Sequence, residues 1–559
     1  MAFWHTVMDS PGTIPYGRRL IPVTIDDVAR DHPERICFSF PHSSDLSDGF
    51  RDLNFRTFAN AINKTAHFIH KEIGRSSMFE TVLYMGYPDV RHWIILVALI
   101  KTGHRVLYSS HRNSVAGHAD LVKKTGCTIL IHTREFPVCG ILEKCRLEIL
   151  CMPELDFLLD DTPCDHYPYT KTWEEAKNDP ILVVHTSGST GLPKPVSWSN
   201  SMFLTTDAHH TVPKLDDGRS CLWGSRFHGT GRGYSALPIF HGAGIASGLA
   251  RAIFLDSVVV LGPPGLATAD TFDQVLEYGN IDAANCLPIT LEEIATRPDI
   301  LAKLRKMDHI VFVGGHLSPE AGDLIIRHVP LYNIIASTET SSLVQHETDL
   351  EDWQYVCLDP IHNGIEMRPI GDDSSLYELV FVRDAEHAVF QGAFKTQPRL
   401  TEYSMSDIYS KHPTKKNHWK HEGRKDDMIV FRSGWNFNPI IHEQFIGSHP
   451  AVQNCVLVGN GKDRPAAIIE LKSDAYAEEE EGKGRLLDAI WPRIKEANRV
   501  ADTAGQLRRE YIIFGKKEKP FAIAGEGTVQ RQATVKKYSP EIEELYTALG
   551  KESGGGPVI

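Results

Sequence analysis

A segment rich in hydroxyl groups and glycine directly follows the β-branched run Ile181–His185 and ends in a lysine. Glycines let backbone N–H groups approach oxyanions closely, hydroxyls add further donors, and the lysine supplies a mobile positive charge. This combination suits a polyphosphate whose pyrophosphate must be held and then released. The candidate phosphate ligands are Thr186, Ser187, Gly188, Ser189, Thr190, Gly191 and Lys194.

Two other interpretations of this segment are weaker. A flexible glycine-serine linker would need neither the preceding strand nor the lysine at a fixed distance from it. A nucleotide loop of the GxxxxGK[ST] type would need a Gly-Lys-Ser/Thr triplet that opens a helix, and the segment has no such triplet.

The text Thr-Ser-Gly-Ser-Thr-Gly-Leu-Pro-Lys-Pro from Thr186 to Pro195 resembles the signature of the adenylate-forming superfamily. That superfamily contains acyl-CoA synthetases, luciferases and the adenylation domains of nonribosomal peptide synthetases. Further motifs similar to those of the family follow in the same order over nearly the whole chain. The resemblance implies an enzyme that uses ATP and Mg²⁺ to convert a carboxylic acid into an acyl-adenylate and releases pyrophosphate.

Two motifs of this resemblance concern the acid and the adenine. Leu237–Gly242 is similar to the family segment that lines the acyl pocket, which implies that His241 and Gly242 contact the acid. The alternative for His241 is a buried histidine satisfied by a backbone partner. Phe312–Ser318 resembles the turn that presents its backbone to adenine and to the acid, through Gly314, Gly315 and His316. A simple tight turn after a strand is the alternative there.

The segment Ala336–Thr340 resembles the motif that contacts the AMP phosphate and the metal. It implies that Ser337 and Thr338 bind the nucleotide and that Glu339 coordinates Mg²⁺, a hard cation that prefers carboxylate and phosphate oxygens. A capping box at the start of a helix is the alternative. The implied catalytic set is His241, Thr338, Glu339 and Lys194. The aromatic-glycine pair that usually precedes this motif is Ile335-Ala336 here, so one adenine-stacking surface is missing.

Two further motifs concern the ribose and a hinge. Asp407 matches the aspartate that accepts hydrogen bonds from the ribose hydroxyls, a task that suits an acceptor-only carboxylate. Arg424 matches the ribose-binding arginine, and Asp426 matches the residue about which the two domains rotate between adenylation and thioester formation. A surface salt-bridge cluster is the alternative for Gly423–Asp427.

One position departs from the family pattern. Close relatives bring a lysine onto the carboxylate and α-phosphate from text like Gly-Lys-Gly-Thr-Val-Gln-Arg, but residue 526 of this chain is Glu526. A carboxylate there would repel the phosphate, and loss of one such contact typically costs about 10²–10³ in rate. The sequence leaves open whether Arg531, Lys536 or Lys537 takes over this role.

The secondary-structure pattern predicts an α/β fold. Apolar runs that read as buried strands alternate with helical segments such as Phe55–Ile69, as expected of mostly parallel sheets flanked by helices. These runs are Thr81–Tyr84, Arg105–Tyr108, Thr128–Ile131, Ile181–His185, Val258–Leu261 and His309–Val313. More strand character around Glu378–Arg383 suggests a β subdomain. We therefore expect a core over residues 1–425, a small mobile α+β domain over 426–546 and a flexible tail over 547–559.

Composition restricts the class of protein. The net charge of −13 over 559 residues argues against a nucleic-acid or anionic-membrane binder. Ten cysteines without a CxxC pair suit reduced thiols. With no secretory signal and no apolar run in the first quarter long enough to cross a bilayer, we expect a cytoplasmic protein.

Several stretches, including Gly527–Thr534, are most similar to adenylation domains of fungal enzymes related to nonribosomal peptide synthetases. The resemblance implies a phosphopantetheine thiol as the acceptor, on CoA or on a carrier protein acting in trans, and a role in secondary metabolism. Gly242–Ser247 contains no carboxylate for a substrate ammonium, which favours an aryl, keto or short aliphatic acid. The alternative function is a degenerate relative that binds nucleotide or a partner without efficient turnover.

Overall fold

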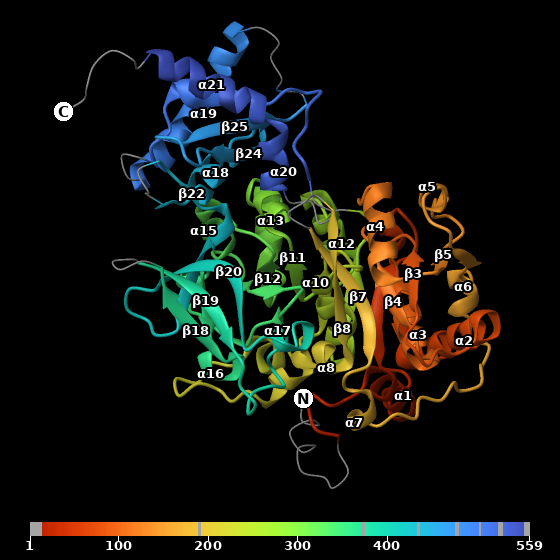
Figure 1. The fold of residues 1–559 in the computed structure, drawn as a ribbon. Helices are drawn as coiled ribbons and strands as arrows, with labels where there is room; N and C mark the ends of the chain where they lie inside the picture. Colours follow the sequence, from red (N-terminus) through yellow and green to blue (C-terminus); the bar gives the residue numbers. More distant parts are fainter. Residues whose placement is uncertain are drawn as a thin grey trace.

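We describe a computed structural model of the chain over residues 14–187, 192–265, 267–370, 375–432, 436–473, 475, 480–501, 505–523 and 529–552. Two large sheets, a β subdomain and a smaller α/β unit make up the molecule (Figure 1). The first large sheet has the strand order β6-β5-β3-β4-β7-β8. Its strands are β3 (Thr81–Met85), β4 (Arg105–Tyr108), β5 (Ile129–His132), β6 (Glu148–Cys151), β7 (Pro180–Ser187) and β8 (Pro193–Ser199).

Parallel pairing dominates both large sheets. In the first sheet only the edge strand β8 runs antiparallel to its neighbour. The second sheet has the order β13-β12-β11-β9-β10-β1-β2, and only β2 pairs antiparallel. Its strands are β1 (Ile36–Pro41), β2 (Phe50–Asn54), β9 (Arg232–Ser235), β10 (Val258–Leu261), β11 (Ala283–Cys286), β12 (His309–Val313) and β13 (Leu331–Ile334). The predicted fold class of mostly parallel sheets is confirmed.

Helices α2 (Phe55–Ile73) and α3 (Arg91–Thr102) belong to the core that joins the two large sheets. Every residue of α3 is buried: its middle is a continuous apolar run, and its charged residues Arg91 and Lys101 lie near its two ends. Trp93 of α3 packs against Phe38 of β1, with ring centroids 4.5 Å apart. On another side of Trp93 lies Gly248, where a Cβ atom would come within 2.2 Å of the indole. This packing fixes the helical segment after Gly242 against the body of the molecule.

The β subdomain is an antiparallel sheet with the order β16-β17-β21-β20-β19-β18. Its strands are β16 (Gln345–His346), β17 (Tyr355–Leu358), β18 (Ile365–Pro369), β19 (Leu376–Val382), β20 (Glu402–Lys411) and β21 (His418–Arg424). Strand β21 leads into the 3₁₀ turn Lys425–Asp427 and then into the smaller unit, drawn in blue in Figure 1. That unit has a three-stranded sheet of β24 (Val452–Val458), β25 (Ala466–Leu471) and β26 (Ile512–Phe514), with α18 (Ile440–Gly447), α19 (Glu480–Val500), α20 (Arg531–Lys537) and α21 (Ser539–Glu552) around it. Among the described residues, no helix is long and apolar enough to cross a membrane.

The buried histidine His209 predicts acid sensitivity. Burial lowers its pKa to about 3, and neither ring nitrogen has a hydrogen-bond partner in the described part of the chain. Because the unfolded state binds this proton near pH 6.5 and the folded state does not, stability should fall as pH drops from about 6.5 towards 3. We expect His209→Gln to reduce the slope of unfolding free energy against pH by up to about 1.4 kcal/mol per pH unit in that window. Urea unfolding between pH 7 and pH 4 measures the slope. The exposed His42→Gln is the control, and an equal loss of slope in that variant would contradict the assignment.

Candidate functional site

A cavity of about 350 Å³ lies where the second large sheet meets the β subdomain. Its walls come from the turn after β12, from the short strand β14 (Ala336–Ser337), from β20 and β21, and from α18 of the smaller unit. Many of the nucleotide ligands predicted from the sequence line this one cavity although they are far apart in the chain. They are Gly314, Gly315, His316, Ser337, Glu339, Asp407 and Arg424.

The turn after β12 is a rigid wall of this cavity. Gly314 has a φ of +89°, which a residue with a side chain rarely adopts, and no atom lies closer than 3.8 Å to where its Cβ would stand. Ser318 then caps the helix α15 (Pro319–Ile325). Glu292 accepts hydrogen bonds from the Ser318 backbone N–H at 2.6 Å and from its hydroxyl at 2.8 Å. The turn therefore offers an open backbone surface that a flat ligand could approach.

The segment Ala336–Thr340 forms a hairpin and not a helix start. Strand β14 pairs antiparallel with β15 (Ser341–Ser342), and the Ser337 hydroxyl accepts a hydrogen bond from the Thr340 N–H at 3.1 Å. The capping-box alternative for this segment is thus wrong. The carbonyl of Thr338 accepts a hydrogen bond from the indole of Trp198 at 2.8 Å, and the carbonyl of Glu339 accepts one from Thr396 at 2.7 Å. Both residues are held by their backbones.

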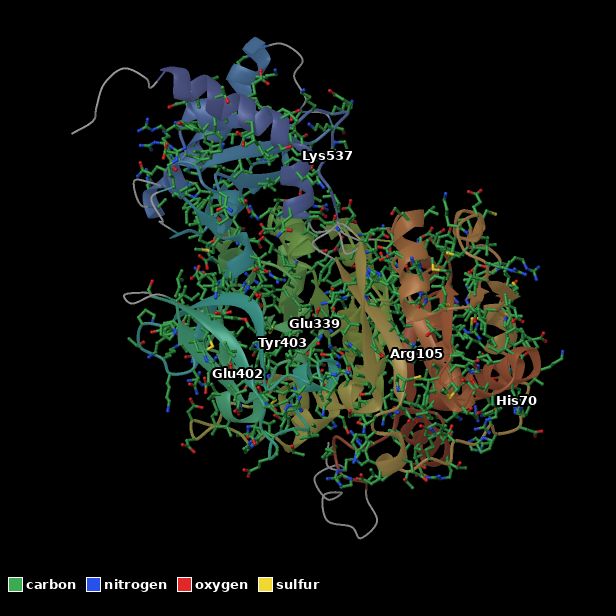
Figure 2. All side chains as sticks on the ribbon, in the orientation of Figure 1. His70, Arg105, Glu339, Glu402, Tyr403 and Lys537 are labelled. Carbon is green, nitrogen blue, oxygen red and sulfur yellow. The ribbon has the colours of Figure 1, made fainter. Side chains whose placement is uncertain are left out.

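Glu339 has a carboxylate that could coordinate a metal ion. Its half-buried side chain lines the cavity, and Figure 2 shows it beside the β subdomain near Tyr403. Within the described residues its carboxylate makes no ion pair. The same part of the chain has no cluster of three or more metal-ligating side chains. Mg²⁺ is usually held by one or two carboxylates together with substrate phosphates, so a single unpaired carboxylate facing a cavity fits this ion.

The strand pair β20–β21 places the ribose candidates. Asp407 and Arg424 are register partners across these strands. The Arg424 side chain is exposed, and its guanidinium lies 3.4 Å from the Asp426 carboxylate, so the salt-bridge alternative accounts for part of its surroundings. The cavity also includes Tyr403, Lys420, His421 and Gln444, which are not among the site residues predicted from the sequence. Tyr403, Met405 and Asp407 follow the period of two expected for one face of a strand, and that signal could have found Tyr403.

The predicted phosphate segment is described only at its two ends. Strand β7 continues through Ser187 and β8 begins at Pro193, with Thr186 and Lys194 as register partners. Lys194 is therefore an exposed strand residue and does not end a loop, a correction to the sequence interpretation. Gly188, Ser189, Thr190 and Gly191 lie outside the described residues. His185 anchors the strand, because its Nε2 atom accepts a hydrogen bond from the Ser110 N–H at 3.0 Å.

His241 and Gly242 stand at the start of helix α10 (Gly242–Ile245). The half-buried imidazole of His241 accepts a long hydrogen bond from the Ala243 N–H at 3.4 Å, which gives the backbone-partner alternative partial support. A Cβ at Gly242 would lie 3.1 Å from Trp198, the residue that also binds the Thr338 carbonyl. Neither residue lines the first cavity. Phe240 lines a second cavity of about 300 Å³ with Leu237, Tyr87 and His111.

The predicted hinge lies on the connection between β21 and the smaller unit. Asp426 belongs to the exposed 3₁₀ turn Lys425–Asp427. Directly behind it, Arg531 of α20 contacts Asp427 at 3.2 Å, forms an ion pair with Glu443, and donates to the Leu457 carbonyl at 2.9 Å. Arg531 is thus held inside the smaller unit, which argues against its taking the place of the missing lysine. Glu526 itself lies outside the described residues.

We expect Arg531→Ala to destabilise the smaller unit by about 3 kcal/mol, because Glu443 would keep a largely buried charge without its partner. Urea unfolding of the whole chain, followed by tryptophan fluorescence, to which Trp491 of α19 contributes, measures the effect. The matched control is Arg432→Ala, since Arg432 and its partner Asp463 are both exposed and should contribute about 0–1 kcal/mol. Equal unfolding midpoints for the two variants would contradict the structural role of Arg531.

Comparison with known proteins agrees with this architecture. The sequence model of the AMP-binding enzyme family matches residues 25–374, and that of the AMP-binding enzyme C-terminal domain matches residues 426–550. The isocyanide synthase-NRPS hybrid crmA of Aspergillus fumigatus is 34% identical over 97% of this chain and 34% of its own length. The carboxylic acid reductase of Neurospora crassa is 35% identical over 95% of this chain and 51% of its own length. The chain thus spans about a third to a half of these relatives.

Solved structures share the fold. The O-succinylbenzoate coenzyme A synthetase of Bacillus subtilis, solved with ATP and magnesium, aligns with a TM-score of 0.64 at 15% identity. The alignment covers 91% of this chain and 98% of that protein. At this identity the likeness speaks for the fold alone. Taken with the family match over most of the chain, it confirms the predicted membership: the chain belongs to the AMP-binding enzyme family of the adenylate-forming superfamily.

Proposed function

We propose that the chain activates a carboxylic acid with ATP and Mg²⁺ to an acyl-adenylate and releases pyrophosphate. One observation carries the proposal. Glu339, whose carboxylate makes no ion pair with any described residue, faces a cavity that also holds a glycine turn and an acceptor-only carboxylate, Asp407. These are the groups that a metal-bound nucleoside triphosphate requires. The family membership supports the same activity, and a structural neighbour was solved with ATP and magnesium.

In this proposal each wall of the cavity binds one part of ATP. Asp407 accepts hydrogen bonds from the ribose hydroxyls, with Arg424 beside it, and Gly314 and Gly315 lie along the base. Ser337 and Thr338 contact the α-phosphate. The β- and γ-phosphates are bound by the segment from Thr186 to Lys194. Glu339 would hold Mg²⁺, which when bound neutralises charge that builds on the departing pyrophosphate.

The acid would enter beside His241 and Gly242. The helical segment after Gly242 packs closely against Trp198 at Gly242 and against Trp93 at Gly248. Its first turns carry no carboxylate to pair with a substrate ammonium. We therefore propose an acid without an α-amino group, of the aryl, keto or short aliphatic type.

A second step would transfer the acyl group to a phosphopantetheine thiol, on CoA or on a carrier protein acting in trans. Rotation about Asp426 would then carry the smaller unit, residues 426–546, between the two steps. The exposure of Asp426 in the 3₁₀ turn Lys425–Asp427, on the connection between β21 and the smaller unit, supports this role. Two of the relatives are named for a reductase and for a synthetase hybrid, so an activated acyl group could instead pass to partner domains of that kind.

Glu526 favours a second candidate function, in which a degenerate relative binds a nucleotide or a partner without efficient turnover. Acid-dependent exchange of labelled pyrophosphate into ATP separates the two. Exchange with at least one member of an acid panel, abolished by omission of Mg²⁺, supports the enzyme. ATP binding without exchange across the whole panel supports the binding-only alternative.

A further inference from the structure

A third cavity, of about 400 Å³, lies at the amino ends of β4 and β7 in the first large sheet, and we call it the base cavity. Its lining includes His104 directly before β4, Ile181 near the start of β7 and Asn200 directly after β8. Its lining residues are distinct from those of the 350 Å³ and 300 Å³ cavities. Figure 2 shows Arg105, the residue after His104, apart from Glu339. The base cavity is therefore separate from the candidate nucleotide site.

The base cavity lies at one end of the hairpin formed by β7 and β8. Pro180 pairs with Ser199 at this end, and the register shifts directly after this pair, at Ile181. Bulges of this kind often re-aim a side chain next to a functional site. The other end of the hairpin, about 23 Å away, carries Ser187 and Pro193, which border the predicted phosphate segment. A ligand in the base cavity would thus contact the hairpin at the end opposite to that segment.

Two buried acceptors belong to the lining of the base cavity. Asn200 is fully buried, and its amide nitrogen donates to the Ala176 carbonyl at 2.9 Å, while its Oδ1 atom has no hydrogen-bond partner among the described residues. The second acceptor is the Nε2 atom of His104, whose Nδ1 atom lies 3.0 Å from the Thr102 hydroxyl. That hydroxyl donates its only proton to a carbonyl of α3, so Nδ1 carries the ring proton and Nε2 a lone pair. Burial lowers the pKa of His104 and so keeps the ring neutral.

These two acceptors favour a ligand with hydrogen-bond donors. A buried acceptor without a donor costs free energy, and a bound hydroxyl group would remove that cost. The nearest carboxylate to His104 Nε2, that of Glu80, is 4.0 Å away, and an ionised carboxylate has no proton to donate.

Arg75 is the cation that the base cavity offers to a ligand. Lys101 also lines the cavity, but its ammonium group contacts the Asp26 carboxylate at 2.9 Å. Lys171 is likewise compensated by Asp179 at 2.6 Å. The exposed guanidinium of Arg75 makes no ion pair within the part of the chain that the structure describes. The lining thus favours an anionic ligand.

Aromatic side chains form a further part of the lining, from Phe79 and Tyr169. Phe79 has a φ of +55°, in the left-handed region that a residue with a side chain rarely adopts. The Ser76 hydroxyl fixes this loop, because it accepts hydrogen bonds from the N–H groups of Met78 at 3.2 Å and Glu80 at 3.1 Å. Strained backbone of this kind is common at ligand sites. It holds an aromatic ring at the wall of the cavity.

We propose that the base cavity is a second ligand site, which binds a small aromatic carboxylate that carries hydroxyl groups. The carboxylate would pair with the guanidinium of Arg75, whose planar fork matches two carboxylate oxygens. The aromatic ring would lie against Phe79 and Tyr169. The hydroxyl groups would donate to Asn200 Oδ1 and His104 Nε2. A volume of about 400 Å³ is within the range of small-molecule sites.

The test is calorimetric binding of 3,5-dihydroxybenzoate, benzoate and resorcinol to the full chain without nucleotide. Benzoate lacks the hydroxyl groups, so it should bind about tenfold more weakly than 3,5-dihydroxybenzoate, the value of one good hydrogen bond. Resorcinol lacks the carboxylate and should bind about fivefold more weakly, a smaller loss because Arg75 is exposed. Addition of ATP with Mg²⁺ should not displace 3,5-dihydroxybenzoate, since the two cavities have separate linings.

Two variants locate the binding. Arg75→Gln should weaken 3,5-dihydroxybenzoate about fivefold and leave resorcinol unchanged, because only the former has a carboxylate to lose. Ser77→Phe adds a ring at an exposed position of the lining and should weaken all three compounds. The matched control is Arg134→Gln, an exposed arginine outside the lining, which should bind as wild-type protein does. Circular dichroism establishes that each variant is folded.

Three results would overturn the inference. They are no binding of 3,5-dihydroxybenzoate to wild-type protein, equal affinity in folded Arg75→Gln, Ser77→Phe and the control, and displacement of the compound by ATP. Binding in the acid pocket of the proposed reaction would be insensitive to Arg75→Gln, so it gives the second of these results. The measurement needs neither turnover nor nucleotide binding, so a negative exchange assay would contradict the proposed function and leave this site standing.

Discussion

Replacing Glu339 by glutamine should lower acid-dependent pyrophosphate exchange by about 10²–10³ while the protein stays folded. The amide keeps the shape and the backbone hydrogen bond from Thr396 but removes the negative charge. Mg²⁺ binds carboxylate oxygen far better than amide oxygen in company with phosphates, so charge on the leaving pyrophosphate would be less well neutralised. The exchange rate at saturating ATP and acid measures the loss, and its dependence on Mg²⁺ concentration should move to higher values.

Glu366→Gln is the matched control. Glu366 lies on β18 of the β subdomain, is exposed and bonds to Arg368, so its loss should leave exchange within about twofold and stability nearly unchanged. If Glu339→Gln exchanged as fast as this control, with the same Mg²⁺ dependence, Glu339 would not be the metal ligand.

Much of the fold could be predicted because buried parallel strands are continuous apolar runs. The runs at Arg105–Tyr108, Val258–Leu261 and His309–Val313 are strands with the predicted bounds. The structure of the segment after His185 was harder to predict. Strand β8 contains Pro193 and Pro195, which read as loop residues, and a sheet accepts them there because β8 is an edge strand.

The sequence could also predict that distant motifs meet in one cavity, because the family motifs identify the residues that bind the nucleotide. The contacts between motif residues and residues outside the motifs could not be predicted. His421 meets His316, 105 positions away, only through the pairing of β20 with β21, whose register shifts between Ile408 and Tyr409. Trp198 binds the Thr338 carbonyl across 140 positions. Such contacts depend on strand register and a bulge, which periodicity does not specify.

Restoring the family lysine with Glu526→Lys should raise pyrophosphate exchange by about 10²–10³, provided that the acid offered is a substrate. The change replaces a charge that repels the α-phosphate with one that attracts it. The structure strengthens this expectation because one alternative cation is already engaged. Arg531 is bound to Asp427, Glu443 and the Leu457 carbonyl, and could reach a phosphate only by breaking these contacts.

The control for Glu526→Lys is Glu518→Lys, an equal change of charge at an exposed position of the same unit. A general electrostatic attraction of ATP would raise exchange in both variants, whereas a specific contact would raise it in Glu526→Lys alone. The gain should appear mainly in the maximal rate, because the lysine acts on charge that develops as the acid attacks. If exchange is unchanged or lower in Glu526→Lys, the repulsion argument fails, and another cation must already serve the α-phosphate in the native chain.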